Sequence, residues 1–279
     1  MRRRPKLVLR GASALVLCLA SPAAAGSISI SIQPVIELRE GALSARVKVS
    51  NVGDEAAQSV AAVLVFGEHK ARGDIHPTLA PKESMDAALS LPVGDLGTGR
   101  WPYQVAVDYT DANQYPFQAI HVGLVTVGSP PPAKVAVSEL KADPLANAGT
   151  LRIRLKNLGG VVRQTVVNVV TPEGIEATTP AVDVKLAAWE ERTVSVPIVN
   201  RTALAGSRYP VFAQVQYDDE GVHQAVAGQG MVSIEAPHSF FEKWRLWFGI
   251  AAGVLVAAWL GVLLVWSMSS RGRRAETRP

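Results

Sequence analysis

Apolar and polar residues alternate along several segments in the middle of the chain. The alternation runs through residues 43–49, 103–109 and 211–217. A period of two is typical of strands that bury one face. Clusters of Asn, Asp and Gly separate these segments at about the 8–12 residue spacing of an antiparallel sandwich. The pattern predicts an all-β body, because no stretch outside the two termini sustains a helical stripe, apart from a possible short turn before the C-terminal run.

The middle of the chain contains an internal repeat. Four blocks recur in the same order at spacings of 106 to 108 residues. Both copies share an Asn-x-Gly strand end, and Pro102, Tyr109 and Asp111 have identical counterparts at a shift of 108. The paired blocks are 43–53 with 151–159, 79–83 with 186–190, 89–92 with 194–197, and 101–111 with 209–219. The repeat predicts two copies of one fold.

A proline-rich segment, residues 129–133, separates the two copies. Three consecutive prolines favour a polyproline II conformation and cannot donate to a central strand, so this segment reads as a short, stiff linker. We therefore predict two tandem immunoglobulin-like β-sandwich domains, residues 26–128 and 134–237. Each is expected to fold as a separate unit.

The repeated blocks resemble a known family. The Asn-x-Gly strand end, the Leu-x-Pro-x-Glu turn at residues 79–83 and the final Tyr-Pro-Val-x-x-x-Val-x-Tyr-x-Asp strand at residues 209–219 are similar to CARDB and related bacterial immunoglobulin-like modules. Such modules recur in cell-surface and periplasmic proteins as spacers, adhesion domains and partner-binding domains. The resemblance implies a non-catalytic role and names no ligand.

Both ends of the chain carry targeting signals. Residues 1–25 have a basic start, an apolar run over 12–20 and small residues at Ala23 and Ala25, which is the pattern of a cleaved secretory signal peptide. Residues 246–268 are 23 residues without a charge, and a helix of that length spans about 35 Å. We predict a juxtamembrane segment at 238–245, a transmembrane helix at 246–268 and a basic cytoplasmic tail at 269–279.

The topology follows from the arginines behind the predicted span. Because positive residues favour the cytoplasmic side, the C-terminus is expected inside and the body in the periplasm or outside the cell. The predicted location is the cytoplasmic (inner) membrane, crossed once, with the lipid bilayer as one partner. A membrane or envelope protein is the expected second partner.

The charge distribution argues against nucleic acid as a partner. The net charge is +4, of which residues 1–25 carry +5 and the end after Ser270 carries +3, so the middle carries 4 − 5 − 3 = −4. A mildly acidic body repels a phosphate backbone. The single cysteine, Cys18, excludes disulfide scaffolds and thiolate metal clusters and is expected to leave with the signal peptide.

Small residues recur every fourth position in the predicted span. Gly249, Gly253, Ala257 and Gly261 lie on one face of a helix, where another helix can approach closely. These four residues are the candidate helix-docking face, for a membrane partner or for a homodimer. Gly and Ala are also common in any transmembrane helix, so a simple anchor is the alternative.

The sequence carries no recognised catalytic or metal-binding motif. The five histidines show no metal-ligand spacing, and no Gly-x-Ser-x-Gly elbow is present, so we expect no enzyme, no metal and no cofactor. The acidic segments 108–111 and 218–220 fit either hairpin turns or calcium sites, with turns favoured. Trp101, Tyr115 and Phe117 fit either sandwich cores or a sugar platform, with cores favoured.

The function expected from the sequence is a non-catalytic envelope scaffold or accessory subunit. It would present two immunoglobulin-like domains outside the membrane for protein–protein contact. The alternative is a carbohydrate-binding or cell-surface adhesion module. An unrecognised hydrolase or metal enzyme would need titratable groups brought together from both copies by folding.

Overall fold

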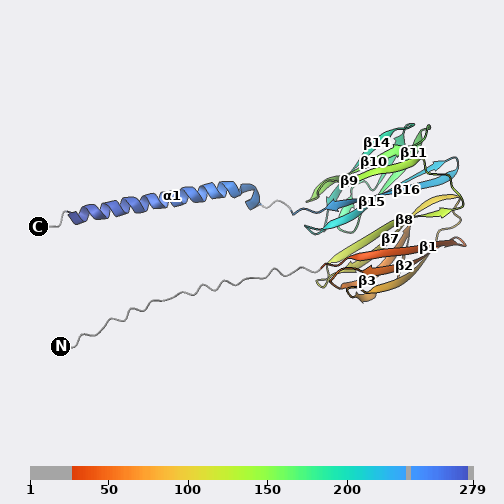
Figure 1. Cartoon of the computed structure of the whole chain (residues 1–279), viewed down its shortest axis with the longest axis horizontal. Helices are drawn as coiled ribbons and strands as arrows, with labels where there is room; N and C mark the ends of the chain where they lie inside the picture. Colours follow the sequence, from red (N-terminus) through yellow and green to blue (C-terminus); the bar gives the residue numbers. More distant parts are fainter. Residues whose placement is uncertain (1–26, 237–239, 276–279) are drawn as a thin grey trace, which may run out of the picture.

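The structure, a computed structural model, describes residues 27–236 and 240–275. The predicted signal peptide lies outside the described residues. Figure 1 shows a body of β-strands followed by one helix, α1 (Phe240–Ala275), at the C-terminal end. The described body is built from strands, as the alternating pattern predicted.

The first copy contributes eight strands. They are β1 (Ile30–Arg39), β2 (Ala42–Asn51), β3 (Ala57–Phe66), β4 (His69–Arg72), β5 (His76–Leu79), β6 (Ser84–Pro92), β7 (Gly99–Thr110) and β8 (Pro116–Val127). One sheet has the order β1-β2-β6, and the facing sheet carries β7, β3 and β4, with β8 paired to β7 and β5 to β3. All pairings within this copy are antiparallel.

The second copy repeats this arrangement. Its strands are β9 (Val135–Ala142), β10 (Ala148–Asn157), β11 (Arg163–Val170), β12 (Ile175–Ala177), β13 (Ala181–Leu186), β14 (Glu191–Asn200), β15 (Arg208–Asp219) and β16 (Val222–Ser233). One sheet has the order β12-β14-β10-β9, and the other has the order β13-β11-β15-β16. Each copy thus buries the inner faces of two sheets against each other.

Each copy has its own hydrophobic core. In the first, Leu43, Val47 and Val49 of β2 are fully buried, because every second side chain of the strand points inward. The second core is built in the same way around Leu151, Ile153 and Leu155 of β10. The two cores contain no residue in common.

The two copies lie side by side, and one parallel bridge between Gly99 of β7 and His223 of β16 joins their sheets into one nine-stranded sheet. The linker is held against both copies at this point. Arg100 donates to the Pro131 carbonyl oxygen at 2.6 Å and to the Gln224 side chain at 2.6 Å. Gln224 in turn donates to Pro131 at 3.2 Å and is 1% exposed.

The repeated Asn-x-Gly motif forms the same corner in both copies. Asn51 is fully buried, donates to the carbonyl oxygens of Glu55 and Leu79 at 2.7 and 3.1 Å, and accepts from the Gly53 amide at 3.0 Å. Asn157 is likewise buried and accepts from Gly159 at 3.1 Å. A buried amide side chain that satisfies loop carbonyls explains why these blocks match.

The turn facing that corner has a left-handed residue in each copy. Lys82 has φ 68° in the first and Trp189 has φ 60° in the second. Lys82 donates from Nζ to the Val52 carbonyl oxygen at 2.8 Å, whereas Trp189 is 67% exposed and its indole lies beside Gly160. The corner therefore accepts either a charged or an aromatic residue at this position.

Trp189→Lys should be tolerated. Because Lys82 occupies the equivalent left-handed position, we expect the free energy of unfolding to change by no more than about 0.5 kcal/mol, the usual range for surface substitutions. Denaturant unfolding of the full chain measures this value. Trp189→Pro is the matched control, because proline fixes φ near −65° and removes the amide that donates to Gly159 at 3.1 Å. A large loss with lysine would contradict the equivalence of the two corners.

The helix α1 contains the whole predicted span, and its described side chains end at Val262. Within the part of the chain that the structure describes, no helix is both long and apolar enough to cross a bilayer. The side chains of residues 263–268 lie outside the described set. The transmembrane span stays a prediction.

Candidate functional site

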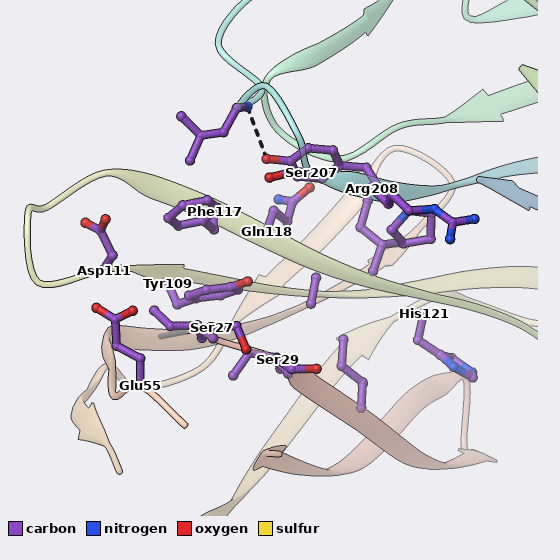
Figure 2. Close-up of a pocket in the computed structure, with 18 residues that line it drawn as sticks. Ser27, Ser29, Glu55, Tyr109, Asp111, Phe117, Gln118, His121, Ser207 and Arg208 are labelled. Atoms are coloured by element: carbon purple, nitrogen blue, oxygen red, sulfur yellow. Dashed lines mark hydrogen bonds between the residues drawn. The ribbon is translucent and has the colours of Figure 1, made fainter. Parts of the chain in front are cut away.

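A cleft of about 530 Å³ opens between the two copies. Its walls come from the start of the first copy (residues 27–32), from β8 (residues 117–121) and from the segment 204–210 of the second copy. Figure 2 shows these three walls converging from strands that lie far apart in the sequence. The cleft exists only because the two sandwiches pack side by side.

Aromatic side chains form one wall of the cleft. Tyr109 and Phe117 are stacked with ring centroids 5.6 Å apart, and Tyr115 is tilted against Phe117 at 5.4 Å. Burial raises the pKa of Tyr109 to about 12, and the charge of Tyr209 adds to the effect. The stacked rings of Tyr109 and Phe117 thus give this wall a flat apolar surface with one phenol group, and Tyr115 lies outside the cleft lining.

The two ends of the cleft carry opposite charges. Glu55 and Asp111 lie at one end, and Arg208 and His121 lie at the other (Figure 2). Asp111 is held by the amides of Asn113 and Tyr115, which donate to it at 2.9 and 2.8 Å. Burial lowers the pKa of His121, so Arg208 supplies the positive charge of its end at neutral pH.

The cleft carries no recognisable catalytic set. Ser27, Ser29 and Ser207 line it, but no histidine in the described residues donates to or accepts from them. No group of three His, Cys, Asp or Glu side chains that could hold a metal ion is found within the described ranges. The arrangement is suited to binding an elongated ligand between two charged ends.

The three aromatic residues singled out in the sequence do not form one platform. Trp101 stacks on His223 with centroids 3.9 Å apart, near the linker, and its indole donates to the Gly97 carbonyl oxygen at 3.1 Å. Tyr115 lies beside the cleft and donates from its hydroxyl to the Thr202 carbonyl oxygen. Both residues therefore join the two copies, a role that was not predicted.

The acidic segments are already engaged by protein groups. Asp108 pairs with Arg72 at 2.7 Å, and Asp218 pairs with His223 at 2.9 Å. Asp219 pairs with Arg163 at 2.9 Å. These three pairs link strands of the same sheet. The turn role expected of segment 108–111 is seen at Asp111, which accepts from the amides of Asn113 and Tyr115.

The candidate helix-docking face lies away from the cleft. Gly249, Gly253, Ala257 and Gly261 are exposed along α1, and a Cβ added at any of the three glycines would meet nothing within 4 Å. Ile250 and Leu260, which are 51% and 49% exposed, fall in the same sector of α1, so the small residues do not form an uninterrupted smooth face. Their docking role stays a prediction.

Several cleft residues could not be identified from the sequence. Arg208 and His121 belong to no motif, and only the packing of the second copy against β8 brings them together with Tyr209. The repeat gave one indirect signal, since Tyr109 and Tyr209 both belong to its most similar block.

Alkaline pH should weaken the region around Tyr109. Its raised pKa means that the neutral phenol is favoured in the folded state. This stabilisation is fully present below pH 10, the ordinary pKa, and is lost as the pH rises through about 12. We expect Tyr109→Phe to reduce the loss of stability over this window, measured by thermal unfolding at several pH values. Tyr115→Phe is the control, and equal effects of both would contradict the assignment.

Comparison with known proteins gives no family. No protein-family profile matches the chain, and no curated protein matches it. Among solved structures, a mutant Salmonella alpha-2-macroglobulin aligns at 15% identity and TM-score 0.32, over 75% of this chain and 16% of that one. The Escherichia coli alpha-2-macroglobulin aligns at 13% identity and TM-score 0.32, over 75% and 17%.

A third match is red sea bream transglutaminase, at 12% identity and TM-score 0.27, over 74% of this chain and 31% of that one. The chain spans less than a third of each of these proteins. The scores are too low to define a shared fold, so the β-sandwich assignment rests on the strand pairing described above. The resemblance to CARDB modules stays a prediction.

Proposed function

We propose that this chain is a non-catalytic envelope accessory subunit that binds a partner protein through the cleft between its two sandwiches. The observation that carries the proposal is that the cleft lies where the chain enters and leaves the body. Ser27 and Ser29 line the cleft, and Ile234 donates to the carbonyl oxygen of Ser207, another cleft residue, at 2.9 Å.

We further propose that residues 246–268 anchor the body in the cytoplasmic membrane. In support, this segment carries no charge, and the side chains of Leu246, Leu255 and Val262 are 67–70% exposed on α1. An apolar helix surface in water is costly, and lipid would cover it. Alkaline phosphatase fused after Pro237 should be active and the same fusion after Pro279 inactive, because the enzyme needs an oxidising compartment. Activity of the fusion after Pro279 would overturn the proposed orientation.

Site-specific photo-crosslinking tests the partner contact. A photoreactive phenylalanine analogue at Gln118, in the cleft, should yield an adduct of one defined mass in intact cells. The same analogue at Ser44, on the outer face of β2, is the matched control. Equal adducts at both positions, or none at Gln118, would contradict binding through the cleft.

Carbohydrate binding is the second candidate function. The stacked Tyr109 and Phe117 offer a surface on which a sugar ring could pack. Titration of the full chain with neutral and acidic oligosaccharides tests it. Binding that Phe117→Ala abolishes would favour this function over a protein partner.

A further inference from the structure

Two strand edges face the cleft without a backbone partner. In the sheet orders, β1 pairs only with β2, and β8 pairs only with β7. Residues 27–32 and 117–121, at the start of these two strands, line the cleft together. An exposed strand edge presents a row of free N–H and C=O groups that can pair with another strand.

The register shows which groups of β8 are free. The Asp111 amide donates to the carbonyl oxygen of Tyr115 at 3.2 Å, which makes these two residues a hydrogen-bonded pair. Because such pairs alternate along antiparallel strands, the backbone groups of Phe117, Ala119 and His121 also bond to β7. Gln118 and Ile120 therefore point their N–H and C=O groups away from β7, and these form no backbone hydrogen bond in the described part of the chain. Ile120 lines the cleft, so its unpaired backbone groups lie on the edge that an added strand could reach.

The edge of β1 limits the length of the site. The Val52 amide donates to the carbonyl oxygen of Ser29 at 2.8 Å, so the backbone N–H and C=O groups of Ser29 and Ser31 point toward β2. The backbone groups of Ile30 and Ile32 therefore point outward, away from β2. Pro34 occupies the next outward position and has no N–H, so pairing cannot continue past it. The cleft ends at the same place, since its lining on β1 stops at Ile32.

We propose that the cleft binds an extended peptide segment of the partner protein, which adds as a strand to the free edge of β8. This inference rests on the proposed function and specifies the ligand. The segment would place an apolar side chain against Tyr109 and Phe117. A basic side chain would lie toward Glu55 and Asp111, and an acidic one toward Arg208. Alternating backbone donors and acceptors on one edge fit a peptide better than a sugar, which has no such repeat.

Peptide titration with a charge swap tests the inference. The probe is a heptapeptide with lysine at one end, glutamate at the other and alternating valine and threonine between them, blocked at both ends and made in both orders. Calorimetry with the full chain in detergent micelles should detect binding of one order, and a version with three prolines should not bind. Arg208→Glu should weaken binding at least tenfold, and replacing the peptide glutamate by lysine should restore it. Arg46→Glu, on the outer face of β2, is the matched control and should leave binding unchanged.

Each result decides the matter. Binding that survives the prolines, or Arg208→Glu without rescue by the swapped peptide, would overturn strand addition. Binding of an oligosaccharide in place of the peptide would overturn it as well. If no peptide binds while crosslinking at Gln118 still succeeds, the partner meets the cleft through a folded surface, and the proposed function stands without this inference.

Discussion

Asp219→Ala is expected to cost the second sandwich about 3–5 kcal/mol, the usual loss when one partner of a buried ion pair is removed. The side chain of Arg163 is 7% exposed, and its guanidinium donates to both Asp219 oxygens at 2.9 and 3.2 Å. It also donates to the Asn157 side chain at 2.9 Å. Removing the carboxylate leaves a positive charge buried without a counter-ion, which explains the size of the effect.

Hydrogen exchange localises the loss. In Asp219→Ala, the free energy of opening measured from amide exchange should fall strongly for β11 and β15. It should fall less for β3 and β7. The control is Asp143→Ala. Asp143 forms a two-point ion pair with Arg152 at 2.7 and 2.9 Å, but on the surface, where such pairs contribute about 1 kcal/mol or less. Similar losses in both variants would mean that burial of Arg163 does not matter.

Asn51→Ala is the second change with a large expected effect. It would leave the carbonyl oxygens of Glu55 and Leu79 and the amide of Gly53 without their partner. Each unsatisfied buried group costs about 1–3 kcal/mol, so we expect a loss of about 3 kcal/mol or more in the first sandwich. Denaturant unfolding measures the loss, and exchange of β2 and β3 amides locates it.

Asn113→Ala is the matched control for this prediction. Asn113 is exposed in the β7–β8 hairpin, and its side chain makes only a 3.4 Å contact with Asp111. We expect a change of no more than about 0.5 kcal/mol. If Asn51→Ala were as mild as this control, the repeated motif would have a role other than closing the corner.

Much of the architecture was predictable because it depends on local chemistry. Alternation over residues 43–49 places β2 and its buried face correctly, since a strand has one geometric period. The repeated Asn-x-Gly ends marked two equivalent corners, and the structure confirms the equivalence through Asn51 and Asn157. Residues 246–268 were predicted to be helical, and they lie within α1.

The candidate site was not predictable in the same way. Tyr109 was noted only as a strand residue of the repeat, and Arg208 was not noted at all, because neither belongs to a motif that local chemistry defines. The sequence predicted that the linker is only a stiff spacer. In the structure, Arg100 of the first copy and Gln224 of the second hold it against both copies. Contacts of this kind depend on how two folded surfaces fit, which no short stretch of sequence specifies.

The sequence by itself therefore determined the β class, the two copies, their corners and the C-terminal helix. Each follows from a period, a turn residue or a composition that acts over a few neighbouring residues. Only the tertiary structure decided that the copies lie side by side, that the outer edges of β1 and β8 face one cleft without a strand partner, and that opposite charges stand at its ends. These features join residues about 90 positions apart, such as Phe117 and Arg208, and they depend on shape complementarity between complete sandwiches.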